Sequence, residues 1–306
     1  MDTKFELKAI LAKWSTHMRS AELSQKAAAR QLGISSGVLS QMLAGKYPGN
    51  IERIAGEMVR MLRRADMRRA RPKRPEYRET PTARRVLDAL IDAHVEGVIV
   101  CVLGRSGVGK TMAARHYCED EPTAMYLEGG PAATPNAVLK SIAGAIHMPV
   151  HGKTWDLRQH IASELHNSGR LLIVDEVDYI PESTLHTLRL ISDNAEMGLA
   201  VIGTPAYLVR LHGRRSATID QWLSRIARVE IINGASREDI EEMVVGLPFD
   251  DEGVAELVRV AEGQTRRAVL TLLAMQRNGY GYKATHVRMA ARELMPSIET
   301  LQKRER

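Results

Sequence analysis

The chain has 306 residues, 44% of them hydrophobic and 26% charged, which is enough for a full α/β core and a smaller domain. No apolar run approaches the roughly 18 residues of a membrane span, and the N-terminus lacks a signal-peptide core. Only two cysteines are present, Cys101 and Cys118. The composition therefore excludes a disulfide framework and favours a reducing, cytoplasmic setting without a membrane partner.

Positive charge is concentrated in the first quarter of the chain. Residues 1–80 hold 17 Lys and Arg against 8 Asp and Glu, a net of +9, whereas the remainder holds 26 against 29. The densest stretch, residues 63–78, has eight basic and two acidic residues and contains Pro72 and Pro75. We predict a basic linker over 63–79. A solvated linker alone would explain it, but such one-sided charge favours a polyanionic partner, double-stranded DNA.

The stretch before this linker predicts two short helices around a tight turn, within a domain over 1–62. Its sequence is SQKAAARQLGISSGVLSQMLAGKYPGN, in which Gly33 suits a turn with positive φ and Ser36 is a candidate N-cap. The pattern resembles the helix-turn-helix of phage-repressor-like DNA-binding domains, whose second helix enters the major groove. That resemblance implies that the DNA-contacting residues are Ser35, Ser36, Ser40, Gln41 and Lys46. A helical bundle for protein contacts is the alternative, and without an arginine in the second helix we expect little sequence discrimination.

A phosphate-binding loop follows an apolar run at residues 98–103. Its sequence, GRSGVGKT, matches G-x-x-x-x-G-K-[ST] between a predicted strand and a predicted helix. Backbone N–H groups would surround phosphate oxygens, the lysine would neutralise the β- and γ-phosphates, and the threonine would ligate Mg²⁺. The predicted ATP-binding residues here are Gly104, Ser106, Gly107, Val108, Gly109, Lys110 and Thr111.

A second buried strand ends in two carboxylates, in the sequence RLLIVDEVD. Four consecutive apolar residues predict a strand of a parallel sheet. Asp175 at its carboxyl end would hold the Mg²⁺ together with Thr111, and Glu176 would act as general base on the attacking water. These motifs predict an ATPase.

The order of the strands resembles that of the AAA+ ATPases. A third apolar strand, GLAVIG, ends at Thr204, where that family has sensor 1, often an asparagine. The resemblance implies that Arg225, or alternatively Arg228, is an arginine finger that completes a neighbouring subunit's site. It also implies that Arg266, at the start of a later helix, is a sensor 2 residue reaching the γ-phosphate. We therefore expect an α/β AAA+ core with a parallel central sheet over 80–234.

The region 235–306 is expected to be a helical lid. Ser236 and Asp239 form a predicted capping pair at its first helix, and Gly263 supplies a turn before Arg266. Together with the small all-α N-terminal domain, these elements complete the predicted fold.

Nearly the whole chain resembles the family of phage Mu transposition protein B. The likeness lies in the domain order and in stretches such as YRETPTARRV, LLIVDEVD, LRLISDNAEMGLAVIG and SRIARVEIING. It implies ATP-dependent, largely non-specific DNA binding as a helical filament that presents target DNA to a transposase, with hydrolysis driving disassembly. It also implies that Thr80 and Thr82 lie near the adenine base.

Two other functions remain open from the sequence. A replication-initiator or helicase-loader ATPase shares the arginine sensor and the DNA-binding module. A repressor-like regulator could use the nucleotide site only to sense ATP.

Overall fold

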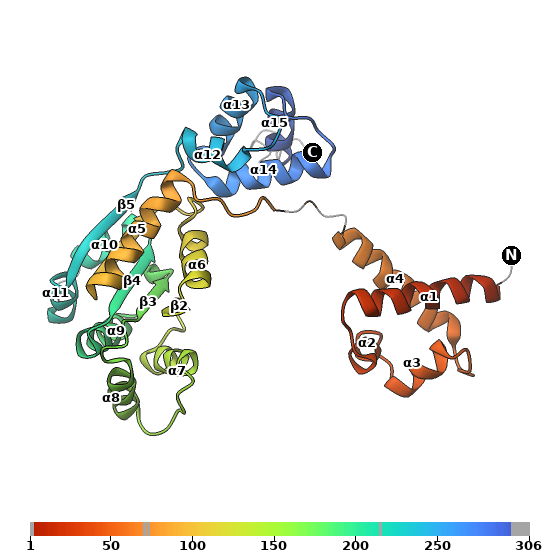
Figure 1. Cartoon of the computed structure of the whole chain (residues 1–306), viewed down its shortest axis with the longest axis horizontal. Helices are drawn as coiled ribbons and strands as arrows, with labels where there is room; N and C mark the ends of the chain where they lie inside the picture. The colour runs from red at the N-terminus through yellow and green to blue at the C-terminus, as the bar shows by residue number, and fades with distance from the viewer. Residues whose placement is uncertain (1–2, 70–71, 73, 214–215, 295–306) are drawn as a thin grey trace, which may run out of the picture. The chain divides into compact units, whose positions relative to one another are not determined.

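The computed structural model describes residues 3–69, 72, 74–213 and 216–294, and the chain divides into two compact units, Met1–Lys73 and Arg74–Arg306. Figure 1 draws the whole chain, and each unit has its own hydrophobic core. Among the helices that the structure describes, none has both the length and the apolar character to cross a membrane.

The N-terminal unit is a small bundle of helices. They are α1 (Thr3–Ser20), α2 (Gln25–Gln31), α3 (Ser36–Leu43) and α4 (Ile51–Arg69). Its core includes Trp14, Leu39 and Met58, each without exposed surface. Gly33 between α2 and α3 has φ +65°, which confirms the predicted turn. The prediction of Ser36 as N-cap is wrong, because the Ser35 hydroxyl accepts the Val38 N–H at 3.2 Å.

Helix α4 continues into the predicted basic linker. The helix extends to Arg69, past the predicted start of the linker at residue 63. No proline or glycine interrupts this segment before Pro72, so the helix can continue there. Residues 70, 71 and 73 of that basic run lie outside the described residues, as do residues 295–306 of the predicted lid.

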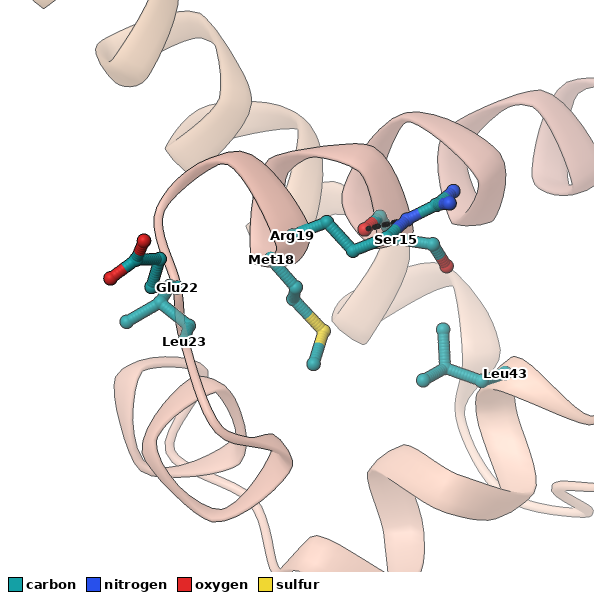
Figure 2. Close-up of a pocket in the computed structure, with 6 residues that line it drawn as sticks. All are labelled: Ser15, Met18, Arg19, Glu22, Leu23 and Leu43. Atoms are coloured by element: carbon teal, nitrogen blue, oxygen red, sulfur yellow. Dashed lines mark hydrogen bonds between the residues drawn. The ribbon is translucent and has the colours of Figure 1, made fainter.

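A shallow hollow in the N-terminal unit lies beside the end of α1 and the end of α3 (Figure 2). Met18, Leu23 and Leu43 line its apolar part. Arg19 and Glu22 supply charges of opposite sign, and Arg19 Nε donates to the Ser15 carbonyl oxygen at 3.5 Å. The hollow thus has no net charge that would select one ligand.

The second unit is built on a parallel five-stranded sheet of order β2-β3-β4-β1-β5. The strands are β1 (Ile99–Gly104), β2 (Ala124–Glu128), β3 (Leu171–Asp175), β4 (Gly198–Gly203) and β5 (Ile226–Ile232). β1, β3 and β4 are buried at every residue, which explains why their sequences are continuous apolar runs.

Helices cover both faces of the sheet. Alternate residues of the central strands enter two cores: Val100 and Val102 face one, and Cys101 and Leu103 the other. The first core is closed by α5 (Pro81–Glu96) and α6 (Lys110–Asp120). The second is closed by α7 (Pro135–Ala145), α8 (Thr154–Leu165), α9 (Glu182–Ala195), α10 (Pro205–His212) and α11 (Ala217–Leu223).

A separate helical core follows the last strand, as predicted for the lid. Its helices are α12 (Arg237–Val244), α13 (Asp251–Ala261), α14 (Thr265–Arg277) and α15 (Ala284–Leu294). The Ser236–Asp239 capping box is confirmed, and Gly263 has φ +72° just before α14. The lid therefore presents the start of α14 to the core.

Candidate nucleotide site and DNA-binding surface

The phosphate loop connects the end of β1 to the first turn of α6. Val108 is buried in the core and anchors the loop, and Gly109 precedes the helix with φ +105°. The N-cap residue, Gly109, has no side chain that could cap the first N–H groups of α6. A helix N-terminus with uncapped amides carries partial positive charge and suits a phosphate. The loop therefore has the geometry that its sequence motif predicts.

Lys110 is held against this loop. Its side chain is only 8% exposed, and Nζ donates to the carbonyl oxygens of Gly104 at 2.7 Å and Arg105 at 3.1 Å. Burial lowers the pKa of Lys110, while the negative charges of Asp175 and Asp178 oppose that shift. The ammonium thus lies at the loop with two carbonyl partners that a phosphate oxygen could replace.

The carboxyl end of β3 supplies oxygen ligands next to the loop. Asp175 Oδ2 accepts from the Thr111 hydroxyl at 2.6 Å and from the Tyr126 hydroxyl at 2.9 Å. Burial raises the pKa of Tyr126 to about 12, so this phenol keeps the proton that it donates. One hydroxyl and one carboxylate at this distance fit Mg²⁺, which prefers hard oxygen ligands and completes its shell with phosphate and water. Within the described ranges no group of three or more His, Cys, Asp and Glu forms a metal cage, and such a Mg²⁺ site needs none.

Glu176 follows directly and has a strained backbone. Its φ and ψ are 51° and 41°, the left-handed region that non-glycine residues rarely adopt. Its N–H donates to Asp175 Oδ1 at 2.8 Å, and its side chain is exposed. Asp175 is buried whereas Glu176 is exposed, so two successive acidic residues have different environments.

Thr204 has a partner that sequence reasoning missed. Its N–H and its hydroxyl both donate to the Asp178 carboxylate, at 2.8 and 2.7 Å, and Arg210 donates to the Asp178 carbonyl. Asp178 stands in the same acidic motif as Asp175, but its spacing alone does not indicate this contact. The polar end of β4 is thus tied to the segment after β3.

The lid touches the phosphate loop through the start of α14. Arg266 donates its backbone N–H to the Gly107 carbonyl at 2.9 Å, and its Nη1 lies 3.4 Å from Ser106 Oγ. A Cβ added to Gly107, where φ is +82°, would lie 3.1 Å from Arg266 Cβ. Arg267, by contrast, pairs with Glu262 of the lid itself. Arg266 is therefore the arginine of this pair that reaches the loop.

A buried carboxylate joins the core to the lid. Asp239 has no exposed surface, and it accepts from the Thr82 N–H and hydroxyl at 2.7 Å each and from the Ser236 N–H at 2.6 Å. Thr80 caps α5 by accepting the Ala83 N–H at 3.3 Å. Of the two threonines that the resemblance places near the adenine base, Thr82 thus uses its hydroxyl to join α5 to α12, and Thr80 uses its own to cap α5.

Arg225 and Arg228 lie at the end of the sheet where the strands begin, away from the phosphate loop. β5 pairs in parallel with β1, and Ile226 stands beside Ile99, the first residue of β1, whereas the phosphate loop follows the last. Five residue steps of a strand separate these ends by about 17 Å. Arg228 pairs with Asp92 and, at 2.7 Å, with Glu230, while the Arg225 side chain is 58% exposed. Arg225 is therefore free to face a neighbour but is too far from its own loop.

All candidate DNA contacts in the N-terminal unit are exposed: Ser35, Ser36, Ser40, Gln41 and Lys46. Helix α3 carries no charged residue, but Lys26 and Arg30 on the preceding helix are also exposed. Sequence reasoning did not assign these two. A polar helix next to basic side chains suits contacts with the DNA backbone more than the reading of bases.

Comparisons with known proteins agree with this geometry. The family described as an AAA domain matches residues 93–211. The chain is 28% identical over 280 residues to the Mu-like prophage FluMu DNA transposition protein B of Haemophilus influenzae, covering 88% of this chain and 96% of that protein. It is 27% identical over 289 residues to the ATP-dependent target DNA activator B of Escherichia phage Mu, covering 91% and 93%.

A solved structure, NtrX from Brucella abortus in complex with ATP, matches with a TM-score of 0.47 and 14% identity, over 85% of this chain and 66% of that one. The parallel sheet, the phosphate loop and the AAA-domain match establish the fold class, and the two curated relatives extend the likeness through both units. The chain thus carries an AAA domain over residues 93–211 and is similar along about nine-tenths of its length to the Mu-type transposition proteins B.

Proposed function

We propose that this chain is an ATP-dependent DNA-binding protein that assembles as a filament on target DNA and delivers that DNA to a transposase, stimulating strand transfer. ATP hydrolysis drives disassembly. The printed name of the phage Mu relative, ATP-dependent target DNA activator B, supports the role in target DNA activation. Filament formation, transposase contact and stimulation of hydrolysis by DNA are parts of the proposal.

The observation that carries the proposal is the separation of two arginines. Arg266 contacts the phosphate loop of its own chain, whereas Arg225 is exposed at the opposite end of the same sheet, where the strands begin. An arginine that stabilises the transferred phosphoryl group must lie within hydrogen-bond reach of it. Arg225 can do so only in a neighbouring copy. ATP would then be held between subunits, and its hydrolysis would weaken the assembly.

Within each site the roles follow from the contacts. Lys110 and the first N–H groups of α6 bind phosphate, and Thr111 with Asp175 would hold Mg²⁺, which would supply charge neutralisation at the phosphates. Glu176, exposed beside this pair, orients and deprotonates the attacking water. Thr204, fixed by Asp178, limits movement at the end of β4.

DNA is bound through phosphate contacts. The exposed polar surface of α3 and its basic neighbours carry little base-reading capacity, and the basic run of residues 63–78 adds positive charge. Affinity should therefore depend weakly on sequence and fall steeply with salt concentration.

The test follows DNA residence time in two nucleotide-site variants. Lys110→Ala should lose ATP binding and stable DNA binding, whereas Glu176→Gln should bind ATP, hydrolyse it slowly and stay on DNA longer. Glu196→Gln is the matched control, because Glu196 is also exposed and also has positive φ, 53°, but lies at the end of α9. Unchanged residence time for Glu176→Gln would refute the ATP-dependent switch.

Electron microscopy with duplex DNA and a slowly hydrolysed ATP analogue tests the assembly. Continuous helical coating of unrelated duplexes supports the proposal. Particles confined to one sequence would favour a replication initiator, and a small fixed oligomer with negligible turnover would favour a regulator that senses ATP.

A further inference from the structure

One carboxylate, Asp193 near the end of α9, lies between two arginines. Its Oδ2 accepts from Arg189 Nη1 at 2.7 Å, and its Oδ1 lies 3.7 Å from Arg225 Nε. Both arginines line one surface hollow together with Gln221 and Ser224 of the α11 region. Each oxygen of Asp193 thus faces a different guanidinium group.

Arg189 is the fixed member of this cluster. It is only 9% exposed, and its Nη2 contacts His186 Nδ1 at 3.4 Å and Gln221 Oε1 at 3.3 Å. Burial and the nearby cations of Arg189 and Arg158 lower the pKa of His186, so its neutral ring can accept. Arg189 therefore links α9 to α11 and holds Asp193 in one place.

Arg225 is the free member. Its side chain is 58% exposed, and its shortest ion-pair distance, 3.7 Å, runs from Nε to Asp193. A guanidinium whose Nε faces one carboxylate still presents its two terminal nitrogens as a fork, which matches phosphate oxygens. An exposed ion pair of this length adds little stability, so its main effect is on the orientation of the Arg225 guanidinium group.

We propose that Asp193, anchored by Arg189, is a positioning residue that aims the Arg225 fork at the nucleotide of a neighbouring copy. This inference rests on the proposed function, because it needs Arg225 to act between subunits. It adds a structural requirement: a subunit must have its α9 carboxylate in place to activate its neighbour, even when its own site is intact.

The test uses full-length protein with duplex DNA and ATP. Asp193→Asn removes the charge that faces Arg225 but keeps a carbonyl oxygen for Arg189. Asp193→Glu, a second variant, keeps that charge and moves it by one methylene. Both should lower turnover on the order of 10- to 100-fold, because small misplacements of a catalytic group have effects of this size, and leave ATP affinity unchanged. Asp220→Asn, which removes an exposed carboxylate of α11, is the control and should match wild type.

Mixing experiments separate positioning from a structural defect. A Glu176→Gln subunit has a slow site but an intact Arg225, so it should activate the intact site of an Asp193→Asn neighbour. An equal mixture should therefore exceed either variant alone, since about one head-to-tail interface in four then pairs two intact halves. Loss of turnover without this rescue would overturn the inference, because Asp193 would then act within its own subunit.

Arg225→Ala distinguishes this inference from the proposed function. If Arg225→Ala loses turnover and is rescued by Glu176→Gln while Asp193→Asn behaves like wild type, the positioning role fails and the shared site stands. If Arg225→Ala keeps full turnover, the role of Asp193 fails, and the shared site itself fails as well if Arg228→Ala, the variant of the alternative arginine, also keeps full turnover.

Discussion

Replacing Asp239 with asparagine should weaken the joint between the core and the lid. The buried carboxylate receives three donors, the Thr82 N–H, the Thr82 hydroxyl and the Ser236 N–H, at 2.6 to 2.7 Å. An asparagine in the same place has one acceptor oxygen, and its NH₂ group would face at least one of these donors. The variant therefore leaves a buried N–H or hydroxyl without an acceptor.

The size of the effect follows from these contacts. A buried donor left unpaired costs about 1–3 kcal/mol, and the remaining bonds lose the contribution of the negative charge, so the total is about 2–4 kcal/mol. Thr82→Val, which removes one donor only, should cost about 1–2 kcal/mol. Asp251→Asn is the control, because Asp251 is an exposed carboxylate in the first turn of α13 and its loss should cost about 0.5 kcal/mol.

Hydrogen exchange gives a local measurement. Amides at Thr82 and Ser236 should exchange on the order of 100-fold faster in Asp239→Asn, since about 1.4 kcal/mol corresponds to a factor of ten. Burial opposes the charge of Asp239, but the Thr82 and Ser236 hydrogen bonds outweigh it and lower its pKa below the ordinary 3.8. Its contribution is therefore complete above about pH 4 and is lost as pH falls through the lowered pKa, and the variant should lack this loss. Equal exchange rates in wild type and variant would refute the reasoning.

Three further experiments test other parts of the structure. Gly107→Ala and Gly246→Ala both place alanine at positive φ, +82° and +88°, and each should lose about 1–2 kcal/mol of stability; only Gly107 lies in the phosphate loop, so only its variant should weaken ATP binding in a titration. Burial raises the pKa of the Cys101 thiol to about 12 and of the Cys118 thiol to about 11, so maleimide at pH 8 should label both slowly until the chain unfolds, and fast labelling of the native protein would contradict this. Lys46→Ala should reduce the slope of log affinity against log salt by about 1 for any duplex, and a sequence-dependent effect would assign it to base reading instead.

The central strands and the phosphate loop could be predicted because their signals are local. β1, β3 and β4 are buried on both faces and therefore read as unbroken apolar runs, and the loop motif stands between a strand and a helix. Conversely, β2 alternates between partly buried and buried residues over only four positions before the exposed Glu128, and its Tyr126 was not assigned to the site.

Contacts between distant residues explain most of what sequence reasoning missed. Thr82 and Asp239 are 157 residues apart, and no local pattern indicates that a capping residue of one helix also holds another. The N-cap error concerns neighbours of the same type: Ser35 and Ser36 are equally good candidates by composition, and only the backbone shows that Ser35 has the extended conformation of a cap.

Arg225 lies at the end of the sheet away from the phosphate loop, and this has a consequence for any row of copies in which each arginine reaches a neighbour's nucleotide. Each copy would give its arginine in one direction and receive one from the other, so the join is head-to-tail and the row has two unlike ends. The copy at one end receives no arginine. Its nucleotide would outlast all others, and short rows would consume less ATP per copy than long ones. The length of a row would thus determine how fast it disassembles, and one end of the row would be more stable than the other.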